Sequence, residues 1–117
     1  MQNREVEAFP KQNYEVTVAA AHAAGDMCLE GGRYGRIVDT VLISTAAMMS
    51  CRGVFEIDKA TTANTWSDRQ KLEAVVNGTT KLFTVQALDK GVCIGEAVGA
   101  TIGTDTFAKV ELIPELN

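Results

Sequence analysis

The sequence has few of the residues that build metal sites and disulfide frameworks. Among 117 residues there is one histidine, and the three cysteines include no C-x-x-C pair. Structural zinc sites typically pair their ligands at short spacing, and an odd number of cysteines does not fit a framework of disulfides. We therefore expect Cys28, Cys51 and Cys93 to be reduced side chains of the core, and we expect no metal or other cofactor.

Basic clusters and long apolar runs are also missing. The net charge is −4, whereas nucleic-acid-binding proteins usually carry a basic patch whose phosphate contacts release counterions. No apolar run approaches the roughly 20 residues of a membrane helix, and residues 1–5 lack the apolar segment of a secretory signal. We expect a protein made in a cytoplasm, with neither nucleic acid nor a membrane as its partner.

Motifs for catalysis are scarce as well. The chain contains no G-x-S-x-G nucleophile motif and no Walker motif, and His22, the sole histidine, lies between alanines in a predicted loop. The remaining candidates are Glu56 and Asp58, which share one face of a predicted strand. They could bind a divalent cation or act as an acid–base pair. A solvated polar face is the simpler interpretation, so we expect no enzyme, with a small enzyme or a ligand- or metal-binding domain as the alternative.

What the sequence does contain is alternation of apolar and polar residues, which is typical of strands. Tyr14, Val16 and Val18 alternate with polar residues, and residues 49–58 place apolar side chains on one parity and mostly polar side chains on the other. The second pattern predicts one continuous, half-buried strand. Further strands are predicted over residues 27–29, 34–41, 91–98 and 107–113.

A hairpin is predicted in the middle of the chain. Residues 68–76 and 81–86 have strand-like patterns, and Asn77-Gly78 between them favours a two-residue type I′ turn. Together, the segments predict an all-β, single-domain antiparallel barrel or sandwich over residues 14–117. Residues 1–13 are polar, contain Pro10 and predict an extended N-terminal arm.

One block of the sequence is distinctive, namely residues 53–61, with the sequence GVFEIDKAT. It resembles the G-V-F-E-L-P-K-A-T signature of the decoration, or cement, proteins of tailed-phage capsids, although Asp58 replaces the usual proline. Weaker similarities on both sides of this block occur in the same order as in that family: Ala24-Gly25-Asp26, Gly32, Gly35, Ile94-Gly95-Glu96-Ala97 and Val110-Glu111-Leu112. The resemblance spans roughly residues 15–113.

The resemblance implies a structural virion protein of barrel-like fold. Such proteins bind the outer surface of a phage capsid, contact the major capsid protein and stabilise the assembled shell. It also implies a homo-oligomer, with a trimer expected and a dimer as the alternative.

The predicted contact residues fall into two groups. Val6, Phe9 and Tyr14 are candidates for contact with the capsid, because Val6 and Phe9 are among the few apolar side chains of the arm and Phe9 is its only large one. The candidates for contact between subunits lie in or beside the distinctive block: Arg52, Glu56, Asp58 and Lys59.

Overall fold

The computed structural model describes residues 13–61, 65–101 and 105–113, and these form an all-β domain, as predicted. The nine strands of these residues are β1 (Asn13–Thr17), β2 (Met27–Glu30), β3 (Arg33–Ile37), β4 (Ala46–Ser50), β5 (Gly53–Asp58), β6 (Lys71–Val76), β7 (Phe83–Ala87), β8 (Cys93–Ala97) and β9 (Phe107–Leu112). No helix that could cross a membrane occurs in these ranges. The predicted strand over residues 34–41 is shorter than expected, because β3 ends at Ile37.

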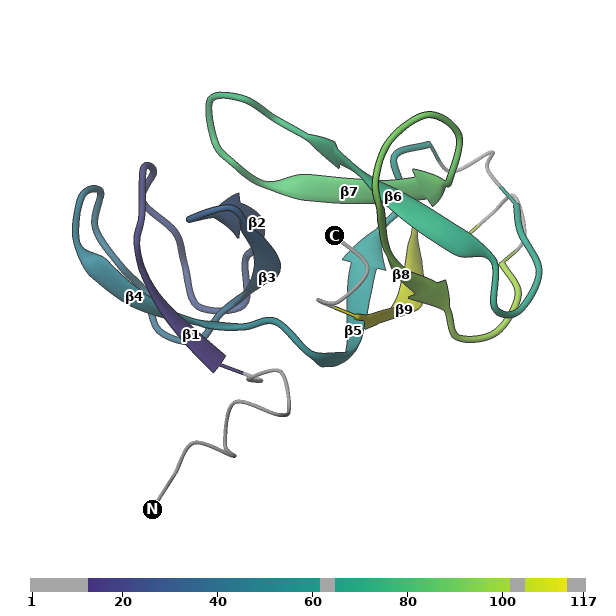
Figure 1. Cartoon of the computed structure of the whole chain (residues 1–117), viewed down its shortest axis with the longest axis horizontal. Coiled ribbons are helices and arrows are strands. Elements are labelled where there is room, and N and C mark those ends of the chain that lie inside the picture. Colours follow the sequence, from purple (N-terminus) through teal and green to yellow (C-terminus); the bar gives the residue numbers. More distant parts are fainter. Residues whose placement is uncertain (1–12, 62–64, 102–104, 114–117) are drawn as a thin grey trace, which may run out of the picture.

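The strands form two antiparallel sheets that lie at opposite ends of the long axis of the molecule (Figure 1). The first contains four strands in the order β1-β4-β3-β2, and the second contains five in the order β5-β9-β8-β6-β7. The chain passes once from the first sheet to the second, between β4 and β5 (Figure 1).

This crossing point corrects the prediction of a continuous strand over residues 49–58. The strand is interrupted at Cys51 and Arg52, and Gly53 continues the chain with φ = 129°, a conformation that favours glycine. The predicted parity of burial is nevertheless correct except at Ser50, which is buried although it lies on the predicted polar face. Cys51 is buried in the core of the first sheet, whereas Phe55 is buried in that of the second. One alternating pattern therefore supplies apolar side chains to two cores.

The predicted hairpin is confirmed, but its predicted turn is wrong. β6 and β7 pair with Val76 opposite Phe83, so the connection is longer than a two-residue turn. The positive φ falls on Lys81 rather than on Gly78. The side chain of Asn77 accepts hydrogen bonds from the backbone N–H groups of Thr79 and Thr80 at 2.9 and 3.0 Å, and this Asx-type capping stabilises the longer loop.

Each sheet has its own buried core. The first core includes Ile37, Met49, Cys28 and Cys51, and the second is larger and includes Phe55. Two of the predicted core cysteines are thus confirmed, whereas Cys93 is only half-buried. All three cysteines are free thiols, as expected.

The second sheet curls toward a barrel, and the two sheets are tied together. The backbone N–H of Ala60, just after β5, donates to the carbonyl of Val85 in β7 at 2.8 Å, so the two outer strands of the second sheet meet at one end. The sheets are joined where Leu29 N–H donates to the carbonyl of Lys81 at 2.8 Å. A groove remains between the sheets beside β5.

Candidate functional site

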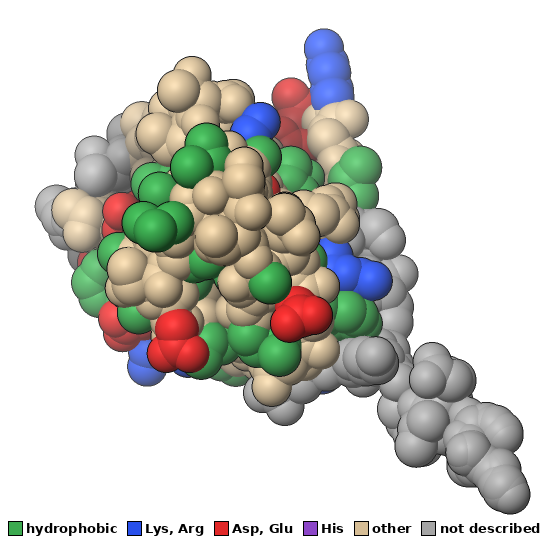
Figure 2. Space-filling model, turned by 90° about the vertical axis from the view of Figure 1, so that its left-hand side faces the viewer, with side chains coloured by type: hydrophobic (Ala, Val, Ile, Leu, Met, Phe, Trp, Pro, Cys, Tyr) green, Lys and Arg blue, Asp and Glu red, His purple; other side chains and the backbone are tan. Residues whose placement is uncertain are grey.

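The connection between β3 and β4 exposes large aliphatic side chains. Leu42 and Ile43, in the middle of this connection, expose 72% and 60% of their surface. Val38, directly after β3, and Met48, within β4, expose 43% and 42%, and Val38 N–H donates to the carbonyl of Met48 at 3.0 Å. We call these four residues the apolar tip. Figure 2 shows hydrophobic side chains among polar ones on this end of the molecule. Single exposed apolar residues are common, but a group of large ones indicates a surface for binding.

The backbone of the apolar tip is held in place by a neighbouring loop. Ser44 N–H donates to the carbonyl of Val18 at 2.9 Å, and Val18 N–H donates to that of Thr45 at 3.0 Å. His22 and Val41 exchange backbone hydrogen bonds in both directions, at 3.0 and 2.9 Å. Since the side chains of Val18 and Val41 are buried in the first core, the loop cannot withdraw Leu42 and Ile43 from solvent without breaking this pairing.

A buried polar cluster fixes the neighbouring loop in turn. The carboxylate of Glu30, which exposes only 3% of its surface, accepts hydrogen bonds from Ala19 N–H at 2.9 Å and Ala20 N–H at 3.2 Å. Its Oε2 atom also lies 2.7 Å from His22 Nε2. On the other side of the imidazole, Nδ1 lies 3.4 Å from Oδ2 of Asp26. His22 thus lies between two carboxylates, but only Glu30 forms a hydrogen bond with its ring, since the buried Nδ1 atom has no hydrogen-bond partner among the described residues.

Burial and hydrogen bonding shift the pKa of Glu30 in opposite directions. Burial by itself raises the pKa of this carboxyl group, but the hydrogen bonds from Ala19, His22 and Ala20 outweigh it, so the pKa lies below its ordinary value of 4.5. Glu30 is therefore ionised at neutral pH and can hold the loop. No group of three or more His, Cys, Asp or Glu side chains in the described ranges is arranged to bind a metal ion.

The sequence did not predict this cluster. His22, Asp26 and Glu30 lie four residues apart, a spacing that would place them on one face of a helix but carries no geometric meaning in a loop followed by a strand. The loop around His22 was predicted correctly. Its carboxylate partners follow from pairing between segments that are distant in the chain.

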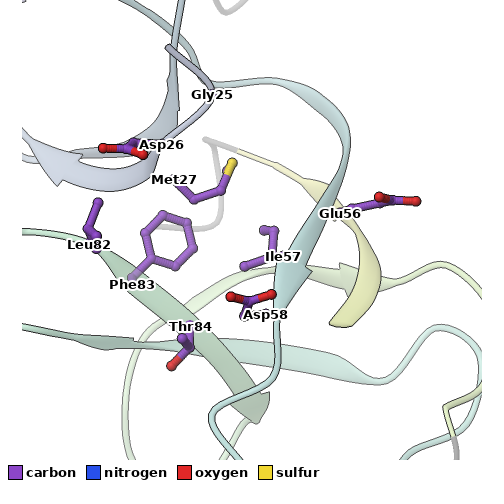
Figure 3. Close-up of a pocket in the computed structure, with 9 residues that line it drawn as sticks. All are labelled: Gly25, Asp26, Met27, Glu56, Ile57, Asp58, Leu82, Phe83 and Thr84. Carbon is purple, nitrogen blue, oxygen red and sulfur yellow. The ribbon is translucent and has the colours of Figure 1, made fainter. Parts of the chain in front are cut away.

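A second surface feature is the groove between the sheets, which Figure 3 shows in close-up. Its wall on the second sheet is β5, and its opposite wall is the segment from Gly25 to Met27, with Leu82, Phe83 and Thr84 at one end. The predicted pair Glu56 and Asp58 lies on the β5 wall, and both residues are exposed on the same face of β5. Figure 3 shows Glu56 directed away from the other lining side chains.

The remaining predicted contact residues lie in different environments. Tyr14 is half-buried in β1 beneath the guanidinium of Arg33, whose Cζ atom lies 3.6 Å from the ring centroid. Arg52 is half-buried at the crossing between the sheets. Lys59 exposes only 5% of its surface, and its Nζ atom lies 5.8 Å from the ring centroid of Trp66, which leaves little of it for a subunit contact.

Two predicted capsid-contact residues, Val6 and Phe9, lie outside the described residues, as does nearly all of the predicted arm. Asn13, the last residue of that arm, is the first residue of β1 and is paired with Ser50 of β4. Comparison of the chain with protein-family models, curated proteins and solved structures found no match, so its function is inferred from the residues and surfaces described above.

Proposed function

We propose that this chain is a structural virion protein that decorates the outer surface of a phage capsid and stabilises the assembled shell. Its partner is the major capsid protein, and it acts by binding rather than by catalysis. The observation that carries the proposal is the apolar tip, a rigid loop that exposes Leu42 and Ile43 to solvent.

The energetics of the apolar tip suit a docking element. Burial of a Leu or Ile side chain contributes roughly 1.5–3 kcal/mol each, so the tip can supply a substantial part of a stable contact. Because backbone hydrogen bonds already fix the loop, little conformational entropy is lost on docking. A protein that binds the assembled shell but not its separate subunits shifts the equilibrium toward the shell.

The resemblance of residues 53–61 to the decoration proteins gives this contact its proposed partner. In the structure this block forms β5 and the segment that closes the second sheet, where Ala60 bonds to Val85. The resemblance of the block supports the choice of partner, and the apolar tip supports attachment to another protein.

A homotrimer remains the expected assembly on the shell, with a dimer as the alternative. Its proposed subunit contacts involve Arg52, Glu56, Asp58 and Lys59, of which Glu56 and Asp58 are the exposed members. Closed contacts between copies would cover strand edges that otherwise invite aggregation. Imaging the protein in its particle tests both this assembly and the position on the outer surface.

The apolar tip provides a direct test of the proposal. A Leu42→Asp/Ile43→Asp variant should lose binding to shells by about 100-fold, because two charged groups replace the apolar anchors. Co-sedimentation with capsids measures the affinity. The matched control is Val75→Asp/Val92→Asp, which changes two residues, in β6 and just before β8, that expose 41% and 57% of their surface.

Both variants should unfold within about 0.5 kcal/mol of the parent, as is usual for exposed positions. Shell binding by the Leu42→Asp/Ile43→Asp variant at the parental affinity would refute attachment through the tip. A thermal shift on adding a divalent cation, abolished by Glu56→Gln/Asp58→Asn, would favour the alternative of a metal-binding domain or enzyme.

A further inference from the structure

One strand edge in the centre of the molecule is open. β5 pairs with β9 through all six of its residues, from Gly53 to Asp58. Along its other edge it lies beside no hydrogen-bonded strand of the described residues, and β7 meets the chain only just beyond its end, where Lys59 and Val85 form an isolated bridge. In an antiparallel pair, every second residue directs its N–H and C=O groups away from the partner strand. β5 therefore presents unpaired backbone groups, which are a template for the addition of a further strand.

The groove lies against this open edge. Figure 3 shows the segment from Gly25 to Met27 facing β5 on one side, with Phe83 between them at one end. Two cavities, of about 300 and 400 Å³, share Gly25, Met27 and Glu56 in their walls, and Arg36 also lines the second. An added strand lies about 4.8 Å from its neighbour, so the groove offers both the volume and the hydrogen-bonding edge for a short extended segment.

The side chains of β5 determine which segment fits. Glu56 and Asp58 project from one face of the strand, and Phe55 and Ile57 project from the other, into the second core. Neither carboxylate forms an ion pair or hydrogen bond with another residue in the described ranges, although Lys109 of β9 lies opposite Glu56. Side chains of neighbouring strands meet on the same face, so a segment that alternates basic and apolar residues complements β5.

We propose that the groove between the sheets binds an extended segment of another protein, in which basic residues alternate with apolar ones, by adding it as a strand to the open edge of β5. The basic side chains pair with Glu56 and Asp58, and the apolar ones cover Met27 and Phe83, which line the groove. This inference does not rest on the apolar tip, and it assigns Glu56 and Asp58 to this partner in place of the subunit contact proposed above.

Charge argues against two other occupants. Pairing of β5 with β5 of a second copy would bring four carboxylates, two Glu56 and two Asp58, to a single interface, and like charges across strands are destabilising. The N-terminal residues of this chain include Glu5 and Glu7, which alternate with Arg4, Val6 and Ala8. If this segment were added as a strand, Glu5 and Glu7 would lie on one face, and they would repel Glu56 and Asp58 if that face met theirs.

The test uses the full-length protein, labelled with ¹⁵N, and a synthetic peptide in which lysine alternates with valine. Heteronuclear NMR should show shifts that concentrate on the amides of β5 and on Gly25 to Met27, with nuclear Overhauser contacts between the peptide backbone and β5. A peptide in which glutamate alternates with valine should not bind. N-methylation of alternate peptide nitrogens should abolish binding, because it removes the donors to the strand edge.

Variants of the protein distinguish binding in the groove from a general attraction between opposite charges. Glu56→Lys/Asp58→Lys should weaken binding of the lysine peptide about tenfold or more, since two cross-strand charge pairs become repulsive. The control Glu15→Lys/Asp39→Lys changes two exposed acidic residues of the first sheet and should bind as the parent does. Absence of binding, equal binding of the N-methylated peptide, or equal loss in the control would each overturn the proposal.

Discussion

Glu30 is the residue on which the loops of the first sheet depend most directly. Its buried carboxylate accepts hydrogen bonds from two backbone N–H groups and contacts His22. Replacement by glutamine keeps the size but removes the charge from these hydrogen bonds. We expect Glu30→Gln to lower the free energy of unfolding by about 2 kcal/mol at pH 7, as measured by urea denaturation, whereas Glu15→Gln on the exposed face of β1 should change it by less than about 0.5 kcal/mol.

The same residue predicts a dependence of stability on pH. The pKa of Glu30 is lower in the folded protein than its ordinary value of 4.5, so the unfolded chain binds a proton at this site more readily. The stabilisation by Glu30 is therefore complete above that ordinary value and is lost as the pH falls through the lower, folded pKa. Urea titrations at successive pH values should show this acid loss reduced in Glu30→Gln. If the stability of parent and variant fell identically with decreasing pH, Glu30 would not be the source of this pH dependence.

The cysteines should differ in reactivity. Burial, with the nearby carboxylates of Glu30 and Asp26, raises the pKa of the Cys28 thiol to about 12, and burial raises that of Cys51 as well. Thiolate is the reactive species, and Cys93 is the one that is partly exposed. A thiol-specific reagent at pH 8 should therefore label Cys93 rapidly in the native protein and all three after unfolding. A rapid native phase that persists in Cys93→Ser would contradict this assignment.

At the scale of elements, the pairing of β8 with β9 depends on a glycine. A Cβ atom on Gly95 would lie 2.1 Å from the carbonyl oxygen of Glu111, a backbone atom that cannot move aside. We expect Gly95→Ala to lower the free energy of unfolding by about 3 kcal/mol. Gly78→Ala is the matched control, because its Cβ would meet nothing within 4 Å, and it should be neutral or stabilise by up to about 1 kcal/mol. Equal melting temperatures for both variants would show that β9 is not so closely packed.

The strands also show which structural features a local sequence pattern can predict. The alternation over residues 49–58 predicted which side chains are buried, because pleating puts alternate residues on opposite faces whatever lies beyond them. It could not predict the interruption at Arg52. The new strand begins at Gly53 with the same parity, so the alternation in the sequence is the same as for one continuous strand. The Asn77-Gly78 pair predicted a turn but not its length, which Asn77 sets through hydrogen bonds to Thr79 and Thr80.

At the scale of the whole molecule, the proposed capsid contact includes residues that the structure does not describe. We expect deletion of residues 1–12 to leave the melting temperature nearly unchanged, because β1 begins at Asn13 and the described residues after it already form both cores. The same deletion, and Phe9→Ala alone, should weaken co-sedimentation with capsids if these side chains anchor the protein. Decoration of shells by the truncated protein at the parental affinity would show that the segment is dispensable.

The sequence by itself determined the strand content and the parity of burial, because both arise from interactions between residues that are close in the chain. It also located Glu56 and Asp58 on a common face. The tertiary structure alone decided that there are two sheets, that Leu42 and Ile43 remain exposed, and that Glu30 and His22 meet in a buried cluster. Each of these depends on which distant segments pair, and the edge of β5 stays open because β7 reaches it only just beyond its end, at Lys59.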